Sequence, residues 1–114
     1  MKALSVRQPY AEAILRGVKS IEFRSRPTNV RGRVYVYATL GRFPGDQEAE
    51  LLERHGIDDV TCDDLPRGLL IGTVELWDCT GTGGDYRWHL RDPERAKKLL
   101  KPTNRPQPTW FEPF

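Results

Sequence analysis

The feature that most limits how this chain folds is a series of short alternating segments separated by glycine and proline. In the clearest of them, residues 33–39, apolar Val and Ala alternate with Tyr and Thr, as in a strand with one buried face. Further strands are expected over residues 4–6, 19–24, 68–79, 86–90 and 110–111. The connections between them are too short for repeated βαβ crossovers. The pattern therefore predicts an α+β fold, a small mixed β-barrel with flanking helices, rather than a doubly wound sheet.

Three helices are expected between these strands. The first begins at Pro9, whose fixed φ suits the first helical position, and ends at Gly17, which can adopt a left-handed cap. The second covers residues 46–53 and carries much of an acidic block. A third, basic helix is expected over residues 92–100, before Pro102.

The size and composition of the chain restrict its class. Its 114 residues suffice for one domain, residues 1–114, and the 38% hydrophobic content lies above the disordered range. No run of about 18 apolar residues is present, so no membrane span is expected. The N-terminus lacks the apolar run of a signal peptide, and two cysteines are too few for a disulfide framework. A cytoplasmic protein with reduced thiols is the simplest prediction.

The charge is distributed unevenly, although the net charge is only +2. Residues 1–33 hold eight Lys and Arg against two Glu, whereas residues 34–67 hold three Arg against eight acidic residues. This asymmetry favours a basic surface for an anionic partner and an acidic element elsewhere. Charge clustering that serves only solubility is an equally good explanation at this point.

Three charged residues are candidates for catalysis. Glu75 interrupts the apolar strand over residues 68–79, and a buried carboxylate is costly unless it is paired or protonated. Its expected partner is Lys19 or Arg24, either in a functional cleft or in a plain salt bridge between strands; alternatively, Glu75 lies on a solvated edge. Lys19 and Glu22 form a second pair, whose amine could act as a nucleophile or base or could bind phosphate, unless both are solvated strand charges. Because strand positions 19 and 22 point to opposite faces, both reach one cleft only if Lys19 lies in a loop or a bulge intervenes.

No metal or organic cofactor is expected. The two His and two Cys residues do not stand at the paired short spacings of zinc sites. No Gly-x-Ser-x-Gly elbow marks a serine nucleophile, and the glycines at 81–84 lack the Lys and helix of a phosphate loop.

A further set of residues combines positive charge with aromatic rings, as surfaces that bind phosphates and stack bases do. The set consists of Arg7, Arg16, Lys19, Arg24, Arg26, Arg31 and Arg33, interleaved with Tyr10, Tyr35 and Tyr37. About half of these rings are expected to pack in the core.

The segments LSVRQPYA (residues 4–11) and GVKSIEFR (residues 17–24) resemble the ASCH domain family. The resemblance extends through residues 32–38 and 72–76 to Trp110. It implies a β-barrel related to the PUA domains of RNA-modification proteins, with a central cleft beside the first helix and the Gly-x-Lys turn. Such a cleft suits RNA or a modified nucleoside.

Some bacterial members of this family are amidohydrolases that deacetylate 4-acetylcytidine. The resemblance implies that their site uses a lysine, a threonine three positions later and a glutamate in a following strand. Lys19 and Glu75 match the lysine and the glutamate, but Glu22 stands in the place of the threonine, so the expected hydroxyl nucleophile is missing.

The leading prediction is therefore an RNA- or nucleoside-binding domain in RNA metabolism or modification. The residues predicted to bind the ligand are Arg7, Gln8, Tyr10, Lys19, Arg24 and Arg26, with Gln8 reading a base edge through its amide. The alternative is an amidohydrolase of 4-acetylcytidine, or less favoured a ribonuclease, with Lys19, Glu22 and Glu75 as catalytic residues. A second alternative is a protein-interaction module of a transcription or RNA-processing complex.

Overall fold

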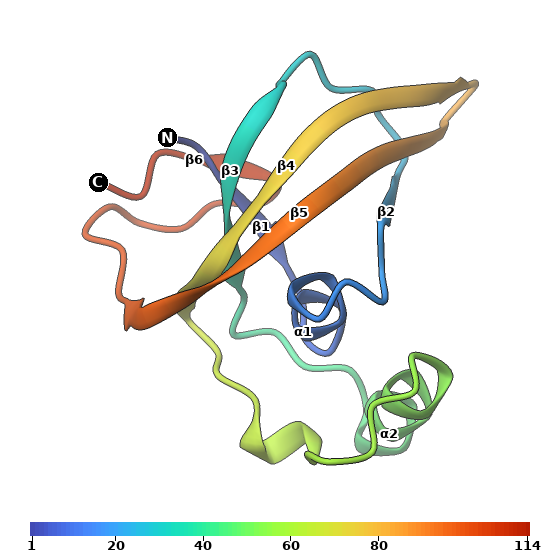
Figure 1. Cartoon of the computed structure of the whole chain (residues 1–114), viewed down its shortest axis with the longest axis vertical. Coiled ribbons are helices and arrows are strands. Elements are labelled where there is room, and N and C mark those ends of the chain that lie inside the picture. Colours follow the sequence, from blue (N-terminus) through green and yellow to red (C-terminus); the bar gives the residue numbers. More distant parts are fainter.

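The computed structural model describes residues 1–114, which form one six-stranded sheet and two α-helices (Figure 1). In chain order the elements are β1 (Ala3–Val6), α1 (Tyr10–Leu15), β2 (Ile21–Arg24), β3 (Gly32–Ala38), α2 (Gly45–Arg54), a 3₁₀ turn (Cys62–Asp64), β4 (Leu69–Thr82), β5 (Asp85–Leu100) and β6 (Trp110–Phe111). The strand order is β2-β5-β4-β3-β1-β6, with β1 and β3 parallel and every other pair antiparallel.

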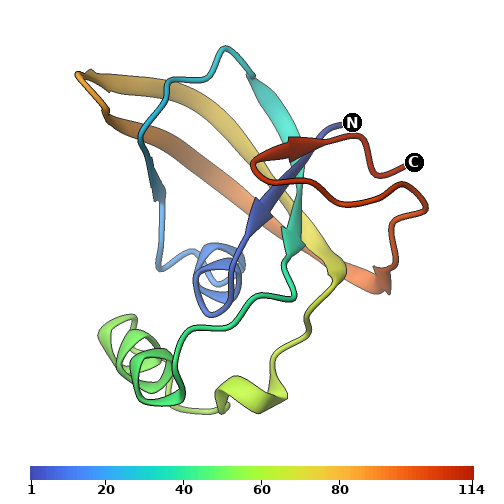
Figure 2. The same ribbon diagram turned by 180° about the vertical axis from the view of Figure 1, so that it is seen from behind.

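The sheet curls around α1, which packs against its inner face (Figures 1 and 2). Ile14 and Leu15 of α1 join the buried side chains of β1, β3, β4 and β5 in the main core. The curl brings together strands that are not neighbours in the sheet. Trp88 of β5, for example, stacks on Trp110 of β6 with ring centroids 5.7 Å apart. The predicted α+β, barrel-like fold is thus confirmed.

Two long strands, β4 and β5, form a hairpin that links β2 on one side of the sheet to β3 on the other (Figure 1). Gly72 allows β5 and α1 to approach β4 closely, since a Cβ there would lie 2.4 Å from both the Glu94 carbonyl oxygen and Leu15 Cδ1. At the far end, Gly83 and Gly84 have φ values of 62° and 89°, which suit a tight two-residue turn.

The helix expected over residues 92–100 is wrong, because these residues continue β5. Pairing with β4 extends to Leu70 opposite Leu100, and register shifts along the ladder accommodate Asp92, at a φ of 52°, and Pro93. The helix-favouring composition of the segment is overridden by the hydrogen bonds that β4 offers it.

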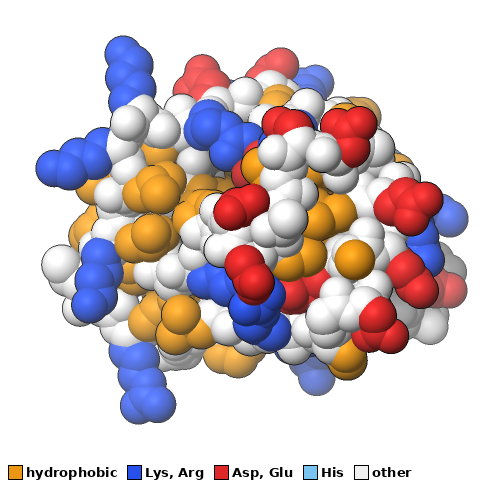
Figure 3. Space-filling view, turned by 90° about the horizontal axis from the view of Figure 1, so that it is seen from below, with side chains coloured by type: hydrophobic (Ala, Val, Ile, Leu, Met, Phe, Trp, Pro, Cys, Tyr) orange, Lys and Arg blue, Asp and Glu red, His pale blue; other side chains and the backbone are white.

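Helix α2 confirms the helix expected over residues 46–53 and lies outside the sheet, beyond α1 (Figure 1). Leu52 packs with Ala13, Ile57 and Leu65 in a small separate cluster. Figure 3 shows Asp and Glu side chains over much of one face, whereas the left end of that view carries Lys, Arg and hydrophobic side chains. Neither helix is long and apolar enough to cross a bilayer.

Candidate functional site

A groove of about 660 Å³ opens at the end of β1. It lies between β2, the loop that follows β3, and the proline-rich segment 105–109. Its charged side chains are Arg7, Arg24 and Arg105 against a single carboxylate, Glu22, and its aromatic side chains are Tyr10, Tyr37 and Phe43. The volume is in the range of pockets that hold small organic ligands, and the charges favour an anionic one.

The carboxylate of Glu22 is held by two cations. Lys19 lies in the loop before β2, so its Nζ comes within 3.4 Å of Glu22 Oε1 and donates to the Ile21 carbonyl oxygen at 2.6 Å. Arg24 Nε donates to Glu22 Oε2 at 2.7 Å. The side chain of Glu22 is only 10% exposed, so the two cations neutralise a charge that water scarcely reaches.

Strand β2 points its polar side chains towards the groove. Glu22 is buried and Arg24 is partly buried, whereas Phe23 between them is 65% exposed on the outer face. Arg24 Nη2 also donates to the carbonyl oxygen of Ser5 in β1 at 2.9 Å. Because β2 is an edge strand and β1 lies near the other edge, this hydrogen bond spans the open side of the curled sheet.

Two aromatic rings form the opposite part of the groove. Phe43 and Tyr10 meet edge to face with centroids 5.8 Å apart. The guanidinium carbon of Arg7 lies 4.6 Å from the Phe43 centroid, and Lys19 Nζ lies 5.0 Å from the Tyr10 centroid. Tyr37 also lines the groove, and its hydroxyl, a protonated donor at neutral pH like that of any tyrosine, has its pKa raised further by burial. The groove therefore combines cations, a hydrogen-bond donor and flat apolar surface.

The sequence was compared with known protein families. The model of the ASCH domain matches residues 4–105, which is most of the chain. The chain belongs to the ASCH domain family. Activating signal cointegrator 1 from Mus musculus and from Homo sapiens are each 41% identical to it over 81 residues. The matched region is 67% of this chain but only 14% of either relative, so the chain spans a small part of their length.

In this ASCH domain Gln8 belongs to the scaffold, which contradicts the prediction that it reads a base. Its side chain is fully buried. Its Oε1 accepts from the Glu12 backbone N–H at 2.9 Å, and its Nε2 donates to the Pro66 carbonyl oxygen at 3.0 Å. Gln8 therefore ties the start of α1 to the segment before β4.

Glu75 does not join the groove, and the prediction that Lys19 or Arg24 is its partner is wrong. Its neighbours Val74 and Leu76 point into the core, so strand alternation places Glu75 on the outer face. There Arg91 of β5 donates to its Oε2 at 2.8 and 3.0 Å.

Arg26 is exposed and is not part of the groove lining. Its carbonyl oxygen accepts a hydrogen bond from Trp88 Nε1 at 3.0 Å. Other basic residues of the N-terminal third also lie outside the groove. Arg16 pairs with Glu12 and Asp59, and Arg33 lies near Glu94, so only Arg7 and Arg24 of the predicted arginines line the groove.

Among the charged and aromatic residues of the groove, Phe43 and Arg105 were not predicted from the sequence. Phe43 lies in a loop with no periodic pattern, and Arg105 is an isolated cation between prolines. The weak signals were an aromatic residue between Gly41 and Gly45 and the extended path that Pro106 and Pro108 impose.

The loop that carries Phe43 is anchored by Glu48 of α2. Glu48 is fully buried; its Oε1 accepts from Arg42 at 2.9 Å, and its Oε2 accepts from the Phe43 backbone N–H at 3.2 Å. Arg67 Nη2 lies 3.3 Å from Oε2. Burial alone would raise the pKa of Glu48, but the arginines outweigh it and lower the pKa. The acidic helix thus fixes one wall of the basic groove.

No group of three or more His, Cys, Asp or Glu side chains is placed to hold a metal ion. Burial, with a contribution from Glu48, raises the pKa of the Cys62 thiol. A raised pKa lowers the thiolate fraction, so Cys62 has little nucleophilic character at neutral pH.

Glu12 makes the stability of the fold sensitive to acid. It is buried in α1 and accepts hydrogen bonds from Arg95 at 2.9 Å and from Arg16 at 2.7 Å. Burial alone would raise the pKa of its carboxyl, but these hydrogen bonds outweigh burial and lower the pKa. The ionised carboxylate thus stabilises the fold above the unfolded-state pKa of about 4.5, and this stabilisation is lost as the pH falls through the lower folded-state pKa.

We expect Glu12→Gln to lower the free energy of unfolding at pH 7 by about 2 kcal/mol and to flatten its decline below pH 4.5. Urea unfolding between pH 7 and pH 3 measures both effects. Glu53→Gln, at an exposed position of α2 without an ion pair, is the control. Equal pH profiles for the two variants would contradict the role given to Glu12.

Proposed function

We propose that this ASCH domain binds RNA or a nucleoside in the groove and acts in RNA metabolism or modification. The observation that carries the proposal is the groove lining, which holds three arginines and three aromatic rings but a single carboxylate, Glu22, already paired with Lys19 and Arg24. Arginines bind phosphates and aromatic rings stack bases, so the lining suits both parts of a nucleotide.

Each side chain has a distinct role in the proposed complex. Arg7 and Arg24 bind phosphate or carbonyl oxygens, and Phe43 stacks on a base. Glu22 accepts a hydrogen bond from an exocyclic amine, as carboxylates do when they read cytosine. Lys19 is a positioning residue, because it holds the Glu22 carboxylate and does not line the groove.

The amidohydrolase alternative has weaker support. Lys19 is held by the Glu22 carboxylate and the Ile21 carbonyl oxygen and does not line the groove, so it is not placed to attack a ligand there or to activate a nucleophile. Glu75, another of the predicted catalytic residues, pairs with Arg91 on the outer face. The relatives are named for an activating signal cointegrator, which is the reason to retain a protein-interaction role as the second alternative.

The test is a titration of the purified protein with a labelled, mixed-sequence RNA octamer and with the four nucleoside 5′-monophosphates. We expect saturable binding, and NMR shift changes confined to residues such as Arg7, Arg24 and Phe43. Incubation with 4-acetylcytidine, with Lys19→Ala as the control, separates the alternatives. Lys19-dependent release of cytidine would replace the binding role with the enzyme. No binding of any probe together with no release of cytidine would refute both.

A further inference from the structure

A second hollow continues from the groove. It has a volume of about 450 Å³ and shares Tyr37, Leu40 and Pro106 with the groove lining. Beyond these shared residues, its lining includes Lys101 and Pro102. Because the two hollows share these wall residues, they adjoin one another, and together they offer more room than a single nucleoside requires.

The floor of the second hollow is apolar and accessible. Leu40 is 72% exposed, and Pro102 and Pro106 lie beside it. Such a surface can contact the faces of unstacked bases or riboses, which a duplex keeps covered.

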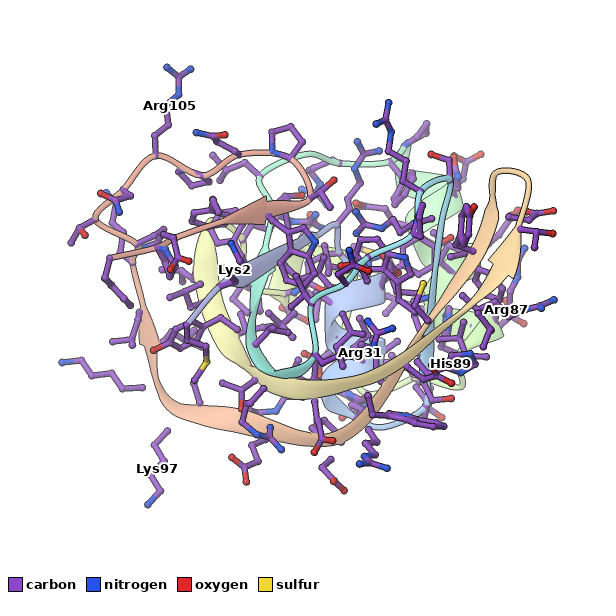
Figure 4. The ribbon with its side chains drawn as sticks, turned by 90° about the horizontal axis from the view of Figure 1, so that it is seen from above. Lys2, Arg31, Arg87, His89, Lys97 and Arg105 are labelled. Carbon is purple, nitrogen blue, oxygen red and sulfur yellow. The ribbon has the colours of Figure 1, made fainter.

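Two cations without acidic partners lie at this hollow and the groove beside it. Lys101 lines the hollow and Arg105 lines the groove, whereas Arg67 of the hollow pairs with Glu48. No acidic residue occurs between Glu94 and Glu112, whereas that interval holds three lysines and two arginines. Lys101 and Arg105 form no ion pair within the protein. Arg105 projects into solvent from the segment beside the groove (Figure 4). These side chains are therefore free to bind phosphates.

We propose, on the basis of the nucleic-acid role above, that the ligand is a single-stranded polynucleotide rather than a free nucleoside. One nucleotide occupies the groove, and the adjoining part of the strand crosses Leu40 and Pro106. Lys101 binds a phosphate of this adjoining part. The two hollows fit a strand because each has a cation without an acidic partner, Arg105 in the groove and Lys101 in the second hollow, and the apolar Leu40 and Pro106 are common to both linings.

The experiment compares the RNA octamer with the 5′-monophosphates on the wild type and on Lys101→Glu. We expect the charge reversal to lower octamer affinity about tenfold and to reduce the salt slope by about 0.7 for the lost phosphate contact. The affinity for monophosphates is expected to stay within about twofold, because Lys101 does not line the groove. Lys97→Glu is the matched control. In Figure 4 the Lys97 side chain points away from the fold at the lower left, whereas Arg105 projects at the upper left.

Three results would overturn the inference while leaving the groove as a nucleoside site. They are equal affinity of the wild type for octamer and monophosphate, equal effects of Lys101→Glu and Lys97→Glu, and tighter binding of a duplex than of the single strand. If neither octamer nor monophosphate binds the wild type, the proposed function fails and the inference fails with it.

Discussion

Replacing Arg7 and Phe43 together by alanine is expected to lower RNA affinity about 100-fold. A base stacked on an aromatic side chain contributes about 1–3 kcal/mol, and a hydrogen bond to a charged group contributes about 1.5–3 kcal/mol. Arg7 already lies over the Phe43 ring in the free protein, so the two side chains form one preorganised surface. Their joint loss should therefore cost about 3 kcal/mol of binding free energy.

The double variant should still fold, because Arg7 is exposed and Phe43 is only partly buried. We expect its free energy of unfolding to change by about 1 kcal/mol or less. Fluorescence anisotropy with the labelled octamer gives the affinity, and urea unfolding gives the stability.

The chain offers a closely matched control on the outer face of the sheet. Phe23 of β2 lies directly opposite Arg87 of β5, and both side chains are exposed. Phe23→Ala with Arg87→Ala removes the same two residue types from a surface outside the groove. If this control loses more affinity than the Arg7 and Phe43 variant, the RNA binds the outer face and the groove proposal is wrong.

Glu48→Ala is expected to be the most destabilising of the substitutions considered, with a loss of about 3–5 kcal/mol. The substitution removes a fully buried carboxylate and leaves Arg67, whose side chain is 11% exposed, without its counter-charge. It also removes the acceptor of the Phe43 backbone N–H, which holds the groove wall. Urea unfolding at pH 7 measures the loss.

Glu50→Ala is the control for this prediction, since Glu50 is an exposed residue of the same helix. It should change the free energy of unfolding by about 0.5 kcal/mol or less. A second readout is RNA affinity at a temperature where Glu48→Ala remains folded, which should fall because Phe43 is released. A loss of stability below about 1 kcal/mol would show that the arginines are satisfied by solvent instead.

The sequence alone predicted the parts of this protein that local patterns determine. Alternation along residues 33–39 predicted β3. Gly17, expected to end the first helix in a left-handed conformation, follows α1 with a φ of 77°. The segments 4–11 and 17–24 predicted the family that the comparison confirmed. These features depend on neighbours within a few residues, so they can be read without the fold.

The tertiary structure decided which charged residues meet. Residues 92–100 form a strand because β4 supplies partners far away in sequence, and this pairing overrides helix propensity. Glu75 and Glu22 both lie in strands and both have cationic partners, but strand orientation puts Glu22 in the groove and Glu75 on the outer face.

The groove itself also depended on tertiary structure. Arg7, Tyr10 and Arg24 were predicted ligand residues and line it, whereas Phe43 and Arg105 enter from segments with no periodic pattern. A sequence pattern specifies which side of an element is apolar, but a site also needs the curl of the sheet and the paths of its loops. Those are set by long-range packing, and this is why the sequence determined the elements and the family while the fold determined the groove.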